Sequence, residues 1–261
     1  MKKLQFFVIS LVAMCFLAIS TVGISQGPPA GVGPGGGGAR DAPDKETKEK
    51  IYRNMAKAFN IDEGTIRNLD AEFEKGGDMS FKEIVMLTNL VAIRADKLIE
   101  QGKYTKDQRK EAIEDSIKDL SQRHRDSQGR GWGELALDEG IPIKNFFMLV
   151  VSASHVLDNE EVYDVRSLQK NLEKQGLPSE DALKIIILAR YQADETVTSK
   201  NIQKNPNLKT ILEQQGGVLQ ESIKYFFEKR QKGVSWEDLA HEVGLSEIGL
   251  NKLAQLLAVQ I

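Results

Sequence analysis

Apolar residues recur at spacings of three and four along most of the chain after residue 44, as in Ile84, Leu87, Leu90, Val91 and Leu98. This spacing places side chains on one face of an α-helix, which can then pack into a core. Asn-Gly hairpin pairs are absent, and alternating β-branched residues are rare. The sequence therefore predicts an all-α protein of about ten mostly short helices.

Helix boundaries are marked by capping residues and glycines. The pairs Ser80/Glu83 and Thr105/Gln108 fit the capping box, in which a hydroxyl and an acid or amide bind free backbone N–H groups. Glycine tolerates the left-handed backbone conformation that ends many helices. On this basis helices are expected to stop at Gly76-Gly77, Gly102, Gly140, Gly176, Gly216-Gly217 and Gly244.

The N-terminal segment has the order of a secretory signal peptide. Lysines at positions 2 and 3 precede an apolar run from Phe6 to Ile19, and small residues follow up to Ser25. Cleavage after Ser25 leaves a mature chain beginning at Gln26, and cleavage after Ser20 also fits. The alternative is an uncleaved membrane anchor over residues 4–24. Residues 26–43, rich in glycine and proline, are expected to form a disordered linker.

Cleavage would also remove the only cysteine, Cys15, so disulfides and thiol nucleophiles are not expected in the mature protein. Residues 1–25 contain two lysines and no acid, so the formal net charge would move from −3 to −5. A mildly acidic chain with mixed charges predicts an exported protein, periplasmic or secreted, that does not bind polyanions in general.

The chain repeats parts of itself. Residues 66–80 align without a gap to residues 165–179, with six of fifteen positions identical. The segment from Trp132 to Ile141 likewise matches the segment from Trp236 to Leu245. We therefore expect two tandem, similar helical units, residues 44–150 and residues 155–261, each long enough to bury a core.

Three stretches resemble the helix-turn-helix of bacterial repressors: residues 52–71, 132–151 and 236–255. Each has a small residue at the helix crossing, here Ala56, Ala136 and Ala240, and a turn residue four positions later, Asn60, Gly140 and Gly244. The second stretch departs from the pattern, with Glu139 in an apolar slot and Pro142 in the turn.

The second helices of these stretches offer few side chains for DNA. The third stretch presents Glu247, Asn251, Lys252 and Gln255, whereas base readout favours Arg, Lys, Asn and Gln flanked by cations that bind phosphates. We expect steep helix pairs and no nucleic acid as partner.

The stretch from Gly129 to Ala136 reads Gly-Arg-Gly-Trp-Gly-Glu-Leu-Ala and is followed by Gly140-Ile141. It resembles uncharacterised exported bacterial proteins with GWGE-type helical repeats. The resemblance is short, and the second copy departs from it with Ser235-Trp236-Glu237-Asp238. It implies export and a helical repeat, and it implies no activity.

Cations precede the only two tryptophans, which makes each tryptophan turn a candidate binding surface for anionic groups. The competing interpretation is structural: cations favour helix C-termini, and a tryptophan can anchor a turn. The candidate residues are Arg123, Arg125, Arg130 and Trp132 in the first unit, and Lys229, Arg230, Lys232 and Trp236 in the second.

Common catalytic and metal motifs are missing. The three histidines, His124, His155 and His241, are neither four residues apart nor next to a cysteine. The acidic run Asp158–Glu161 lacks the spacing of a calcium loop and is expected to be a solvated helix start. We expect no catalytic residues, no metal and no cofactor.

The predicted function is an exported, non-enzymatic binding or scaffold protein with an envelope or extracellular partner, expected to be a protein. The alternatives are a nucleic-acid-binding module and an envelope hydrolase of unrecognised type.

Overall fold

The computed structural model describes residues 43–76, 79–126, 131–201 and 208–261. Within these ranges the chain forms eleven α-helices, one short 3-10 helix and no strand, which confirms the predicted all-α class. The predicted signal peptide, nearly all of the linker and Arg130 lie outside the described residues. The helices are α2 (Lys45–Phe59), α3 (Glu63–Gly76), α4 (Phe81–Glu100), η1 (Lys106–Gln108), α5 (Arg109–Asp126), α6 (Trp132–Asp138), α7 (Ile143–Ser154), α8 (Asn159–Glu173), α9 (Ser179–Asn201), α10 (Leu208–Gln231), α11 (Trp236–Glu242) and α12 (Glu247–Gln260).

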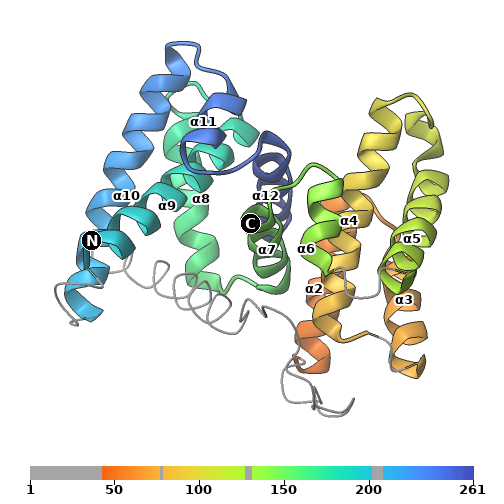
Figure 1. Cartoon of the computed structure of the whole chain (residues 1–261). Helices are drawn as coiled ribbons and strands as arrows, with labels where there is room; N and C mark the ends of the chain where they lie inside the picture. The colour runs from red at the N-terminus through yellow and green to blue at the C-terminus, as the bar shows by residue number, and fades with distance from the viewer. Residues whose placement is uncertain (1–42, 77–78, 127–130, 202–207) are drawn as a thin grey trace.

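Two groups of helices flank a central pair. Figure 1 shows α2 to α6 in one half of the molecule, α8 to α11 in the other, and α7 with α12 between them. The last helix, α12, packs against α2, α7 and α9. Large buried side chains such as Phe59, Phe146 and Phe226 belong to one continuous core cluster drawn from both halves. The predicted duplication into two units, with its boundaries, stays a prediction.

Most helix boundaries follow from the capping chemistry read in the sequence. Ser80 and Glu83 form the reciprocal capping box at the start of α4. The side-chain oxygen of Gln108 accepts from the backbone N–H and hydroxyl of Thr105. Among the glycines predicted to stop helices, four have positive φ: Gly102, Gly140, Gly176 and Gly244.

The prediction for Gly216-Gly217 was wrong, because both residues lie inside α10. A glycine in a helix costs about 1 kcal/mol relative to alanine. Beyond the pair, Leu219 and Phe226 are buried and Val218 and Ile223 pack on the core, so α10 gains an apolar contact face. Tertiary packing against α9 outweighs the local preference.

The three predicted helix-turn-helix crossings share one backbone arrangement. The N–H of Ile61, Ile141 or Leu245 donates to the carbonyl of the alanine five positions earlier, at 2.9–3.0 Å. The residue just before each donor, Asn60, Gly140 or Gly244, has positive φ. All three alanines are buried. The small side chain and the left-handed turn therefore recur as the sequence predicted.

A cluster of three charged side chains joins α12 to the first half of the molecule. Lys252 of α12, only 5% exposed, and Arg109 of α5 both bind the carboxylate of Asp96 on α4. Arg109 also donates to the carbonyls of Phe59 and Asn60 at the end of α2. Burial lowers the pKa of the Lys252 ammonium below its ordinary value, although attraction to Asp96 opposes the shift.

Candidate functional site

The first tryptophan turn is packed as a structural anchor. Trp132 begins α6 and is 7% exposed. Its ring stacks on that of His124 with centroids 4.0 Å apart, and its Nε1 donates to a carboxylate oxygen of Glu83 at 3.4 Å. One face of the indole and its only donor are thus used within the protein, which favours the structural interpretation.

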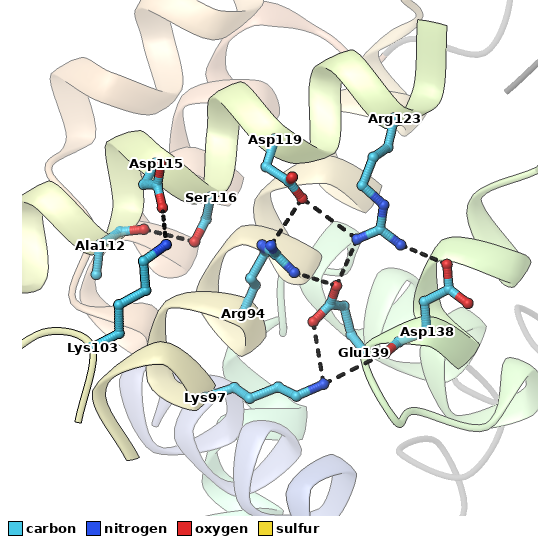
Figure 2. A network of polar contacts seen from close by, with 10 residues as sticks. All are labelled: Arg94, Lys97, Lys103, Ala112, Asp115, Ser116, Asp119, Arg123, Asp138 and Glu139. Carbon is cyan, nitrogen blue, oxygen red and sulfur yellow. Dashed lines mark hydrogen bonds and ion pairs between the residues drawn. The ribbon is translucent and has the colours of Figure 1, made fainter. Parts of the chain in front are cut away.

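The arginine before this turn belongs to an ion network centred on a buried carboxylate. Glu139, at 2% exposure, accepts from Arg123 at 2.9 Å and from Arg94 at 2.8 Å, and Lys97 lies 3.6 Å away. Figure 2 shows these side chains together with Asp119 and Asp138, which also pair with Arg94 and Arg123 respectively. This is why a glutamate can occupy an apolar slot of the second helix-turn-helix.

The network balances three cations against three carboxylates, so it holds no surplus charge for an external anion. Burial alone would lower the pKa of Arg123, but hydrogen bonds and attraction to Glu139 and Asp138 raise it instead. Arg125 is exposed at the end of α5 and takes no part in the network drawn. The first group of candidate residues therefore does not converge on one ligand site.

The second tryptophan turn is more open. Trp236 is half-buried, with the guanidinium of Arg230 4.7 Å and the ammonium of Lys184 5.3 Å from its ring centroid. Arg230 also donates to the carbonyl of Val234 at 2.9 Å. The ring is thus covered by cations of its own protein. The two tryptophans were expected to be equivalent anchors, yet the structure buries only the first fully.

The remaining cations of the second group are paired or separate. Lys229 binds the carboxylate of Glu242, and this hydrogen bond leads the causes that raise the pKa of the lysine. Lys229 also lies 4.5 Å from the ring centroid of Tyr225. Lys232 is exposed. Figure 1 shows α6 and α11 in different halves, so the two tryptophan turns form no common surface.

A pocket that sequence reasoning missed lies between α7, α9 and α12. Its volume is about 70 Å³, and it is partly open to solvent. Its walls are mainly aliphatic, since two helices direct leucine and isoleucine side chains at it and the loop after α7 adds one more. These are Ile186 and Ile187 of α9, Leu253, Leu256 and Leu257 of α12, and Leu157.

Polar side chains complete the pocket wall. Arg190 and Tyr191 follow the two isoleucines along α9 and are buried, with Arg190 at 8% exposure. His155 is also buried, and its Nε2 lies 3.2 Å from a carboxylate oxygen of Glu161 on α8. The N–H of Leu157 donates to the side-chain oxygen of Gln260 at 2.9 Å. Ser152 of α7 is the fifth polar residue of the wall.

One sequence signal could have pointed to this pocket. Arg190 lies three and four residues after Ile187 and Ile186, so the periodicity of α9 puts a cation on an apolar helix face. A charge in that position needs a partner or a function. The acidic run after residue 157 is only partly the solvated helix start that was expected. Asp158 does cap α8, but Glu161 is buried against His155.

The described residues show neither a metal-binding cluster nor a membrane-spanning helix. In the part of the chain that the structure describes, no three His, Cys, Asp or Glu side chains are grouped so that they could hold a metal ion. No described helix is long and apolar enough to cross a membrane.

Known proteins offer no relative for this chain. No protein-family model, no curated protein and no solved structure matches it. The resemblance to GWGE-type exported proteins therefore stays a prediction, and function has to be argued from the site.

Proposed function

We propose that this chain is an exported, non-enzymatic binding protein whose ligand site is the pocket between α7, α9 and α12. The observation that carries the proposal is an open, mainly aliphatic pocket with buried polar groups in its wall, which is the usual form of a small-ligand site. The cations of the two tryptophan turns support it less, because most of them are paired within the protein.

Export rests on the leader alone: two lysines, an apolar run and small residues, in that order. We expect the mature protein to begin at Gln26 and to meet its ligand, or a protein that carries it, in the envelope or outside the cell. Retention of the leader would instead anchor the same binding body to the membrane.

A nucleic-acid-binding function has less support. Lys252, on the second helix of the third helix-turn-helix, is buried against Asp96 and is not available to a phosphate backbone. On α7, Asn145 is buried, and its amide can donate to the carbonyl of Gly244 and accept from the N–H of Ser246. The more exposed face of α7 carries Ile143 and Phe147, which cannot read base edges by hydrogen bonding.

A hydrolase has one observation to consider. Ser152 and His155 both line the pocket and His155 binds Glu161, so the residue types of a hydrolytic triad lie close together. The imidazole Nε2 is directed at Glu161, and no hydrogen bond between Ser152 and His155 is present among the described residues. Without a bond between nucleophile and base, the geometry favours binding over hydrolysis.

The experiment compares two serine-to-phenylalanine variants on one helix. Ser152→Phe places a ring in the pocket wall, whereas Ser154→Phe makes the same change two residues on, outside the lining. Each protein is isolated from the exporting cell's envelope fraction, its N-terminus is sequenced, and small molecules released by denaturation are measured by mass spectrometry.

The proposal expects Gln26 as the first residue and a molecule released in stoichiometric amount from the wild type and from Ser154→Phe. Ser152→Phe should release none. An intact Met1 on cytoplasmic protein would contradict export, and equal release from both variants would contradict the pocket as the ligand site.

A further inference from the structure

We propose that the pocket between α7, α9 and α12 binds a short or branched aliphatic carboxylate, with the alkyl end inside and the acid group against Arg190. This inference rests on the proposed binding function and names the chemical class of its ligand. Two sources share that chemistry, a free small acid and the C-terminus of a peptide that ends in an aliphatic residue.

Size limits the apolar part of the ligand. The pocket of about 70 Å³ is close to half the ~150 Å³ apolar cavity that accommodates benzene. An alkyl end of roughly three or four carbons therefore fits, comparable to a leucine side chain, and a long lipid tail does not. Because the pocket is partly open, the rest of the ligand can extend toward solvent.

Charge selects the polar part. Arg190 is the one arginine or lysine among the residues that line the pocket, and none of them is an Asp or Glu. Buried to 8% exposure, its charge acts in a medium of lower dielectric than water, where attraction to an anion is stronger. A guanidinium offers five N–H donors, so it can bind a carboxylate while keeping contacts within the protein.

The neighbouring polar groups also favour an acceptor-rich ligand. The side-chain oxygen of Gln260 already accepts from the N–H of Leu157, which directs the amide so that its NH₂ group remains to donate. The hydroxyls of Ser152 and Tyr191 can donate as well. A carboxylate accepts several such bonds, whereas an alcohol or an amine accepts fewer or none.

The test measures binding by isothermal titration calorimetry with the full exported chain. The probes are 4-methylpentanoate and the uncharged alcohol of the same skeleton, 4-methylpentan-1-ol. A second pair consists of a leucine-terminated peptide with a free C-terminus and the same peptide amidated. Charge-assisted hydrogen bonds predict that the free acid of a pair binds roughly tenfold or more tightly than its neutral form.

Variants separate the charge from the cavity. Arg190→Met should abolish the preference for the acid and leave binding of the neutral form unchanged, while Arg190→Lys should keep part of the preference. Ser152→Phe should abolish binding of every probe, and Ser154→Phe should change nothing. Far-ultraviolet circular dichroism checks that each variant is folded, and the comparison of acid with alcohol in the wild type does not depend on any variant.

The outcomes distinguish the two sources and the two levels of the proposal. Tight binding of 4-methylpentanoate alone identifies a free acid, and tight binding of the free peptide alone identifies a C-terminus. Equal affinity for acid and neutral forms, or a preference that survives Arg190→Met, would overturn the ligand class. If no probe binds although Ser152→Phe still eliminates the natural ligand, the ligand class is wrong and the proposed function stands.

Discussion

Single residues in this protein illustrate how burial decides the role of a charge. Lys252, Arg123 and Glu139 look like surface residues in the sequence, yet each is at least partly buried and paired with groups from distant segments. The sequence pattern marked Glu139 as out of place but could not supply its partners, because Arg94 lies 45 residues away in the chain. Trp132 was predicted as an anchor correctly, whereas Trp236 is more exposed because an arginine side chain covers it instead of a stacked histidine.

The Asp96 cluster gives a prediction at this scale. Replacing Asp96 with alanine leaves Lys252 and Arg109 without their shared carboxylate and should cost about 3 kcal/mol, at the lower end for a broken buried pair. Lys252→Met removes a buried charge and leaves Asp96 with Arg109, so it should change stability by less than about 1 kcal/mol. Urea unfolding at pH 7 measures both. A larger cost for Lys252→Met than for Asp96→Ala would show that the lysine, and not the carboxylate, is the stabilising group.

Elements were predicted well wherever local chemistry sets them. The capping box at Ser80, the left-handed residues of the three turns and the buried alanines at the crossings were all read correctly from the sequence. The error at Gly216-Gly217 has the opposite origin. There the helix continues because residues farther along α10 pack on α9, and such packing is not visible in local sequence.

A matched pair of glycine substitutions tests this contrast. A β-carbon added at either Gly244 or Gly217 would have no other atom within 4 Å, so only backbone conformation separates the two sites. Gly244→Ala forces alanine into φ +70° and should destabilise by about 1–2 kcal/mol. Gly217→Ala, inside α10, should stabilise by about 0.5–1 kcal/mol. Denaturant unfolding decides it, and the same sign for both would contradict the assigned conformations.

The whole molecule brings together parts that the sequence alone does not connect. The pocket joins Ser152 to Gln260, more than a hundred residues apart, so periodicity could identify each helix but not the space between them. Helix order agrees with the predicted duplication: the short helices α6 and α11 each start at a tryptophan and precede α7 and α12. The two units nevertheless stay a prediction.

Net charge makes a prediction at this scale for nucleic acid. With a formal charge of −5 for the predicted mature chain and Lys252 buried, we expect no salt-dependent binding of duplex DNA at micromolar protein. Non-specific binders show dissociation constants of about 10⁻⁴ to 10⁻⁶ M and lose affinity steeply with salt. A fluorescence anisotropy titration at two salt concentrations measures this, and binding that weakens steeply with salt would put the nucleic-acid interpretation first.

The central claim is that the pocket between α7, α9 and α12 is a ligand site. Its most direct test is a high-resolution crystal structure of the protein purified from its native envelope fraction. The account predicts electron density for a small molecule whose apolar end contacts Ile186 and Leu256 and whose acceptor atoms lie within hydrogen-bond distance of Arg190. A pocket that holds only water, or that its own side chains fill, would contradict the account.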